Sequence, residues 1–395
     1  MMRGTWKKGK KNVNFRVYMM ALATVAVGLV ELIVGGILPS IADEFNVSLS
    51  TAGQLITVFA FVFAIAGPVL LALTSEFERK KLYLMALFVF FIGNIITFFS
   101  PTFTVMMIAR VITAASTALV IVLSLTIAVK IVAPTHRAKA IGVISMGISS
   151  SLVLGVPIGI MITNAFGWRY IFLAIAVLSI GSMILISVFL EAVPGEKMIP
   201  LRQQLKTLKS SKVMSAHLAI LLMLTGHFTL YAYFRPFLES TMDLNATLIS
   251  LCYLLFGVAA VSGGAIGGTL SDNIGPKKSM IIVLSVFALS MAILPFTTFS
   301  LISFIPVMMI WGALSWGLSP AMQSYIIEID PKTAPVQQSF NNSALQIGIS
   351  VGSIIGGVLL EQTGSVASMP FVGSFIVVIA LGFALFSFSR TYPSV

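Results

Sequence analysis

Stretches of apolar residues long enough to cross a lipid bilayer recur along this 395-residue chain. A helix rises about 1.5 Å per residue, so about 20 residues cross the roughly 30 Å of hydrocarbon in a bilayer. The stretches lie near residues 17–41, 51–73, 82–99, 104–129, 139–163, 170–190, 213–238, 246–270, 279–296, 301–327, 335–360 and 366–388. The sequence therefore predicts twelve transmembrane segments.

The composition and texture of these stretches predict helices rather than barrel strands. Charged residues make up 9% of the chain and hydrophobic residues 58%, with a mean hydropathy of +1.03, whereas soluble domains carry about 25% charged residues. Backbone that faces lipid must bond internally, which only helices and closed barrels achieve. Runs such as FVFFIGNII (88–96) lack the alternation of barrel strands. An all-α integral membrane fold is expected.

An internal repeat divides the chain into two halves. At an offset of 197 residues, GVPIG (155–159) falls on GSIIG (352–356), and the loop TSEFERKK (74–81) falls on SDNIGPKK (271–278). Two related six-helix halves are typical of secondary transporters, whose substrate site lies between the halves.

The predicted organisation places two helical bundles around a basic linker. The segments are a cytoplasmic N-terminus (1–16), an N-terminal six-helix bundle (17–190), a cytoplasmic linker (191–212), a C-terminal six-helix bundle (213–388) and a cytoplasmic tail (389–395). Within the linker, LRQQLKTLKSSK predicts a short basic amphipathic helix on the inner membrane surface. If the N-terminus is cytoplasmic, twenty of the 24 Lys and Arg residues lie inside and only Arg169 and Arg235 lie outside. This bias fits the positive-inside rule, so both termini are expected in the cytoplasm.

The net charge of +11 does not indicate a nucleic-acid partner. The basic residues are spread along the loops next to the membrane, where they favour contact with the lipid bilayer. The single cysteine, Cys252, lies within a span and excludes an intramolecular disulfide, and three scattered histidines give no metal-ligand spacing. We expect a monomer without cofactor or metal.

Three ionisable residues lie deep within predicted spans: Glu31, Arg110 and His227. Each such residue costs about 2.5–3.5 kcal/mol to insert, so it needs compensation. Counted from the span ends, all three lie at a similar depth, on helices 1, 4 and 7. Together they predict a central aqueous cavity with a proton-coupling role.

Glu31 is the first candidate for a proton carrier. Desolvation favours a neutral carboxyl and a nearby Arg favours the charged form, so a changing distance between Glu31 and Arg110 would load and release a proton. The alternatives are a permanent Glu31–Arg110 ion pair that only joins helices 1 and 4, or no contact. His227 is expected either to titrate or hydrogen-bond the solute, or to be a satisfied neutral side chain.

Further polar and aromatic residues are candidates for solute binding on helices 7, 10 and 11. They are Tyr231, Trp316, Gln323, Asn342 and Gln346. Asn342 and Gln346 are four residues apart and are expected to share a helix face. Interhelical hydrogen bonding is the alternative role for the two amides, and packing is the alternative for the tryptophan.

A strip of small residues marks helix 5. Gly147, Gly155 and Gly159 recur at spacings of eight and four residues, and Pro157 removes one backbone donor and is expected to bend the helix. Such a strip lets a neighbouring helix pack closely. We expect that neighbour to come from the other half and to slide during transport, with static packing as the alternative.

The whole chain resembles the major facilitator superfamily, in particular its twelve-helix drug and metabolite efflux branch. Four patches carry the resemblance: ELIVGGILPSIADEFNVS, TSEFERKK, GISSSLVLGVPIG and GWRYIF. The third is similar to the antiporter motif of that branch. The resemblance implies a central cavity lined by helices 1, 4, 7 and 10, and a bacterial cytoplasmic membrane.

The chain departs from the family pattern in the loop between helices 2 and 3. Ser75 and Glu76 occupy the places where the family carries Asp and Arg. In the second half Asp272 is retained, so Asp272 with Lys277 and Lys278 is the expected cytoplasmic gate.

These features predict a secondary transporter that exports a small organic solute, such as a drug, purine, nucleoside or sugar, in exchange for protons by alternating access. Such antiporters confer multidrug resistance when drugs are the solute. The alternative is a facilitator or proton symporter for a sugar or nucleoside, and from another class a membrane solute sensor. No paired carboxylates and no nucleophile beside a base lie within a span, so an enzyme is not expected.

Overall fold

The computed structural model describes residues 15–195, 207–331 and 333–391, and these residues form helices without any strand. Twelve helices in these ranges are long and apolar enough to cross a membrane, which confirms the predicted number of spans and the all-α fold. Most ends fall within a few residues of the predicted ones. The N-terminal segment 1–14 and the first part of the expected basic linker helix lie outside the described residues.

The first half contains the spans α1 to α7. They are α1 (Phe15–Phe45), α2 (Leu49–Leu73), α3 (Arg79–Phe98), α4 (Phe103–Ile131), a fifth span made of η1 (Pro134–His136), α5 (Arg137–Ser150), η2 (Ser151–Gly155) and α6 (Val156–Phe166), and α7 (Arg169–Phe189). The second half follows the short turn η3 (Thr207–Lys209). Its helices are α9 (Ser211–Tyr231), α10 (Phe234–Met242), α11 (Ala246–Ile274), α12 (Pro276–Ile293) with η4 (Leu294–Thr297), α13 (Leu301–Ile329), α14 (Ala334–Thr363) and α15 (Met369–Ser389).

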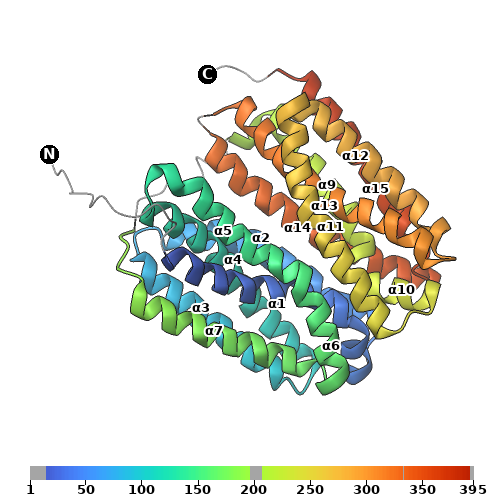
Figure 1. Ribbon diagram of the computed structural model, residues 1–395, viewed down its shortest axis with the longest axis horizontal. Helices are drawn as coiled ribbons and strands as arrows, with labels where there is room; N and C mark the ends of the chain where they lie inside the picture. Colours follow the sequence, from blue (N-terminus) through green and yellow to red (C-terminus); the bar gives the residue numbers. More distant parts are fainter. Residues whose placement is uncertain (1–14, 196–206, 332, 392–395) are drawn as a thin grey trace.

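The two halves lie side by side, with the blue-to-green helices on one side and the yellow-to-red helices on the other (Figure 1). Helix α1 begins and α15 ends at the same end of the bundle, which we call the termini end. We call the opposite end the far end. Helices α2 and α14 pack along each other where the halves meet, and α6 and η2 contact α11.

The glycine strip of the fifth span packs on α1 of its own half. A Cβ at Gly147 would lie 2.5 Å from the carbonyl oxygen of Ala21, and Cβ atoms at Gly155 and Gly159 would meet Leu29 and Ile33. The expectation that this strip faces the other half is therefore wrong. Its spacing shows that a smooth face exists, but spacing alone does not identify the helix that packs against it.

The C-terminal half repeats this arrangement, because the glycines of α14 pack on α9. Cβ atoms at Gly348, Gly352 and Gly356 would lie 2.3–2.6 Å from carbonyl oxygens of α9. Between the halves the close approach is made instead by Gly257 of α11, whose added Cβ would lie 2.7 Å from the Cα of Val153 in η2.

Two prolines explain where the spans are irregular. A proline in a helix removes one N–H group and its ring collides with the carbonyl four residues earlier. Pro157 follows the π-helical segment η2, which widens the fifth span where that collision would occur. Pro236 lies four residues after Ala232, where the seventh span breaks into α9 and α10, whereas the sequence predicted a continuous segment over 213–238.

The loop between α2 and α3 is fixed to the start of the linker by Glu78. Its carboxylate caps α3 by accepting hydrogen bonds from the backbone N–H groups of Lys80 and Lys81, and it also accepts one from Val193. Partial burial acts to raise the pKa of Glu78, but these donors and the charge of Lys81 outweigh it and lower the pKa below its usual 4.5.

The lowered pKa makes the stabilisation by Glu78 dependent on pH. Because the carboxyl is more acidic in the folded chain, its contribution is complete above about pH 4.5 and is lost as the pH falls through the lower, folded-state value. We expect Glu78→Gln to lower the unfolding temperature at pH 7, with a difference from the parent that shrinks in acid. A thermal-unfolding series from pH 7 to pH 3 measures this, and a pH-independent difference would contradict it.

The backbones of α11 and α13 approach each other closely at Gly263. A Cβ at Gly263 would lie 1.8 Å from the carbonyl oxygen of Ala313, whereas the neighbouring Gly264 has nothing within 4 Å. We expect Gly263→Ala to destabilise the fold by about 1–3 kcal/mol through overpacking, and Gly264→Ala to be neutral or slightly stabilising. The buried thiol of Cys252 reports unfolding with a thiol-reactive dye. Equal unfolding temperatures for the two variants would refute this account.

Candidate functional site

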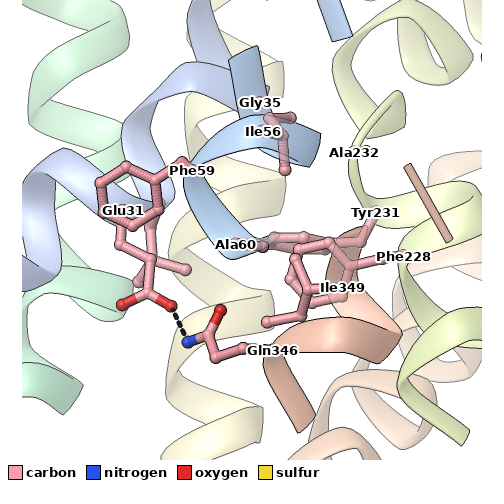
Figure 2. A pocket seen from close by; sticks show the side chains of 11 residues that line it. Glu31, Gly35, Ile56, Phe59, Ala60, Phe228, Tyr231, Ala232, Gln346 and Ile349 are labelled. Atoms are coloured by element: carbon pink, nitrogen blue, oxygen red, sulfur yellow. Dashed lines mark hydrogen bonds between the residues drawn. The ribbon is translucent and has the colours of Figure 1, made fainter. Parts of the chain in front are cut away.

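A small cavity lies between the halves at the middle of the bundle. Its walls come from α1, α2, α9 and α14 (Figure 2), and the residues that line it are Glu31, Leu32, Gly35, Ile56, Phe59, Ala60, Phe228, Tyr231, Ala232, Gln346 and Ile349. The space open to the centre of a water molecule is about 20 Å³, and one water needs about 10–15 Å³. In this conformation the cavity has room for a water molecule but not for an organic solute.

Glu31 and Gln346 meet in this cavity from opposite halves. The side-chain amide of Gln346 donates a hydrogen bond of 2.8 Å to the Oε1 atom of Glu31, and the two side chains point toward each other in Figure 2. The other amide atom, Oε1 of Gln346, is buried without a partner in the protein. A single hydrogen bond to an ionisable group therefore crosses from α1 to α14 at the centre of the molecule.

Arg110 lies behind Glu31 and is held by the backbone. Its guanidinium donates to the carbonyl oxygens of Val30 (2.8 Å) and Leu55 (3.3 Å) and stacks 4.1 Å from the ring centre of Phe59. Arg110 is near enough to Glu31 for an electrostatic interaction, but these two described residues form no direct ion pair. The permanent bridge considered from the sequence is therefore absent from this conformation.

His227 lies next to the cavity but does not line it. Its ring stacks on Tyr231 (centroids 5.1 Å apart, planes at 22°) and contacts Phe256 and Trp311. Tyr231 forms part of the cavity wall, so the predicted pair His227 and Tyr231 is brought together at the edge of the site. The Nδ1 atom of His227 and the hydroxyl of Tyr231 are buried and lack partners in the protein. Burying such a group without a hydrogen bond costs about 1–3 kcal/mol.

The remaining predicted solute-binding residues lie outside this cavity. Trp316 is partly buried on α13, while Gln323 and Asn342 are exposed. Asn342 thus does not share the pocket with Gln346, although both are on α14. The expected gate residues Asp272, Lys277 and Lys278 are exposed and make no ion pair in the described structure.

The sequence did not single out the apolar part of the site. Phe59 and Phe228 line the cavity, and Trp311 and Phe256 pack behind Tyr231. Aromatic residues within long apolar runs carry no signal that separates a site from ordinary packing. On α2, Phe59 and Ala60 lie three and four residues after Ile56, so the three side chains share one helix face. Packing against any helix gives the same pattern.

Hydrogen bonds join the halves on both sides of the cavity. Besides Glu31 and Gln346, three hydrogen bonds within the described ranges cross the boundary. They join Ser343 to the Ala64 carbonyl (2.9 Å), Ser353 to the Gly53 carbonyl (3.1 Å), and Arg235 to the Gly36 carbonyl (2.9 Å). The bonds at Gly53 and Gly36 hold the halves together toward the far end, whereas the Ser343 bond lies on the termini side of Gln346.

Tyr233, at the break between α9 and α10, fills the space between α2 and α14 near the far end. An added Cβ at Gly53 would lie 2.0 Å from the Tyr233 hydroxyl oxygen, and one at Gly357 would lie 2.7 Å from it. The hydroxyl also donates to the Ser353 carbonyl. The two glycines therefore make the room that this tyrosine needs for the halves to close.

The described residues form twelve apolar helices in two packed halves. The water-sized cavity between the halves contains one carboxyl and one amide, each from a different half. These features define a polytopic membrane transporter. A profile of the Major Facilitator Superfamily matches residues 20–353, so the chain belongs to that family.

Similar proteins support this assignment. The chain is 35% identical to the MFS-type transporter YbcL of Bacillus subtilis (strain 168), over 98% of this chain and 97% of that protein. It is 27% identical to a probable sugar efflux transporter of Mannheimia succiniciproducens, over 93% and 92%. Among solved structures, it matches a bacterial homologue of the human lysosomal transporter Spinster, in an inward-facing and occupied conformation, with a TM-score of 0.77, 16% identity and coverage of 96% and 97%.

The fit of Tyr233 between glycines predicts that Gly53→Ala opens the far end. The new methyl would occupy the place of the hydroxyl, so the closed arrangement becomes strained and the population moves to one that is open there. In a Cys252→Ser background, Ile349→Cys in the cavity wall reports the change by its labelling with a membrane-impermeant maleimide from the far side. We expect faster labelling in Gly53→Ala.

Two variants make this labelling test specific. Gly142→Ala has nothing within 4 Å of the added carbon and should label like the parent. Tyr233→Phe removes the atom closest to the added methyl and should partly reverse the effect of Gly53→Ala. Labelling of Gly53→Ala at the parent rate would show that Tyr233 does not control closure.

Proposed function

We propose that the chain exports a small organic solute in exchange for protons by alternating access, with Glu31 as the proton carrier. The observation that carries this proposal is the hydrogen bond between Glu31 and Gln346, because it joins an ionisable group to the boundary that must open and close. Export as the direction is supported by the similarity to a probable sugar efflux transporter.

The termini end is proposed to face the cytoplasm. Basic side chains are concentrated at that end of the described helices, among them Lys80, Lys81, Arg137 and Lys139, as the positive-inside rule requires. The far end, where Tyr233 lies between α2 and α14, would then face the outside.

Protonation of Glu31 changes the strength of the contact with Gln346. A hydrogen bond to an ionised group contributes about 1.5–3 kcal/mol, and one between neutral groups about 0.5–1.5 kcal/mol. When the acid is protonated, the unpartnered Oε1 atom of Gln346 accepts a hydrogen bond from its O–H group in a weaker, neutral contact. The ionised, empty carrier is thus held in the closed far-end arrangement, and protonation weakens the hold.

This difference in hydrogen-bond strength meets a requirement of antiport. An exchanger must change conformation when it carries a proton or a solute, and must not when it carries neither. Proton binding replaces the charge-assisted bond by a neutral one, and a solute that enters between the two side chains breaks it. Arg110 lies near Glu31 but is bonded to the Val30 and Leu55 carbonyls, so it does not compete with Gln346 for the carboxylate in this conformation.

Replacing the carboxyl by a permanent neutral amide should separate exchange from coupling. In proteoliposomes loaded with a solute panel, we expect Glu31→Gln to exchange solute down its gradient at near-parent rates, because the side chain resembles the protonated acid. Its response to an imposed pH gradient should disappear. Solute flux and proton flux are both followed.

The matched control is Glu361→Gln, which changes an exposed carboxyl near the far end and should retain coupling. If Glu31→Gln still accumulates solute against its gradient when a pH gradient is imposed, Glu31 is not the proton carrier. Solute uptake that proceeds with protons in the same direction would instead establish a symporter.

A further inference from the structure

A cluster of rings in the C-terminal half adjoins the central cavity. We call it the His227 cage and define it as the side chains of His227, Tyr231, Phe256 and Trp311. The ring centroids of His227 lie 5.1 Å from Tyr231 and 5.2 Å from Trp311, and those of Phe256 and Trp311 lie 4.9 Å apart. Tyr231 belongs both to the cage and to the cavity wall, and Figure 2 shows it among the residues that line the cavity. The cage is thus one side chain away from the space in which Glu31 and Gln346 meet.

Three polar atoms of the cage have no partner in the protein. They are Nδ1 of His227, the hydroxyl of Tyr231 and Nε1 of Trp311. The residues that carry them are only 4%, 4% and 0% exposed, so bulk water does not reach them freely. Buried polar groups in proteins are nearly always hydrogen-bonded. Three unbonded atoms on rings in mutual contact therefore indicate a site that a ligand completes.

The chemistry of these atoms restricts the ligand. The indole N–H of Trp311 can only donate a hydrogen bond, and the Tyr231 hydroxyl is free to donate, so the ligand must present acceptor atoms. The ring planes of His227 and Phe256 differ by 12° and those of His227 and Tyr231 by 22°. Near-parallel ring faces favour a flat aromatic ring that stacks in the same direction.

A sugar fits these groups less well. Sugar hydroxyls can accept hydrogen bonds from Trp311 and Tyr231, but a sugar has no flat aromatic ring to stack on the ring faces of the cage. None of the described ring contacts of the cage involves a charged side chain that would attract an organic ion.

We propose that the His227 cage is the solute-recognition subsite of this transporter and that its solute carries a neutral, planar heteroaromatic ring with hydrogen-bond acceptors at its edge. This inference rests on the proposed function and names its solute class. Tyr231 and Trp311 donate to the acceptor edge, and the ring stacks on the aromatic faces. The cavity of this conformation has room only for a water molecule, so Tyr231 must move aside to admit the ring of the solute.

The test measures binding without any pH gradient. The full-length protein in nanodiscs is titrated with tritiated inosine, a neutral nucleoside with a planar purine base, and with tritiated lactose as the sugar probe. We expect inosine to bind and lactose to bind at least tenfold more weakly. Tyr231→Phe and Trp311→Phe keep the rings and remove one donor each, so each should weaken inosine binding about tenfold, the effect of one lost hydrogen bond of about 1.4 kcal/mol.

Tyr325→Phe is the matched control, because its hydroxyl bonds Ser387 at the termini end, far from the cage. It should bind inosine with the affinity of the parent, and all variants are compared as monodisperse protein. Unchanged inosine binding in both donor variants would mean that water alone satisfies these atoms and would overturn the proposal. Lactose binding as tight as inosine binding would overturn it as well.

The same measurements separate this inference from proton coupling. If inosine binds in a donor-dependent way but never moves protons in proteoliposomes, the ring subsite stands and the exchange mechanism fails. If lactose drives proton flux while inosine does not bind, the exchange mechanism stands and the ring subsite fails.

Discussion

The hydrogen bond between Glu31 and Gln346 is the contact on which the rest of this structure depends. A carboxyl within an apolar span is costly unless it is neutral or compensated. Here the compensation comes from an amide of the other half, not from the nearest cation, because backbone carbonyls and the ring of Phe59 already hold Arg110. The stability of the carboxylate and the closure of the two halves are therefore coupled, because the same hydrogen bond contributes to both.

Close backbone contacts allow the halves to come near enough for that bond. Gly257 lets α11 approach the widened helix at η2, and Gly53 and Gly357 admit Tyr233 between α2 and α14. In a membrane no hydrophobic effect drives helices together, so association depends on such packing and on interhelical hydrogen bonds. Within the described ranges four side-chain hydrogen bonds cross the boundary, and the rest of the contact is van der Waals packing. By contrast, the glycines of the fifth span pack on α1 and those of α14 pack on α9, so they hold helices together within each half.

The sequence predicted the framework well because length and polarity determine it. Twelve apolar stretches could only be helices. The offset of 197 residues aligned Gly155 with Gly352, and these two glycines pack alike, the first against α1 and the second against α9. Glu31 and Gln346 were identifiable because polar groups in spans are rare. Their contact was not, since it depends on how the halves are placed. The break at Ala232 was missed, although Pro236 four residues later was its visible cause.

The choice of an amide as the partner of Glu31 has a mechanistic consequence. An arginine at position 346 would hold an ionised carboxyl so firmly that protonation would be strongly opposed, and an apolar residue would leave the carboxylate without compensation. Glutamine donates to the ionised acid and accepts from the protonated one, so a bond across the boundary exists in both states and only its strength changes. That change is about 1–2 kcal/mol, small against the transmembrane potential, which supplies about 2.3 kcal/mol per charge at 100 mV. In the proposed mechanism, a contact of this size lets the proton bias the conformational equilibrium without trapping the carrier on either side.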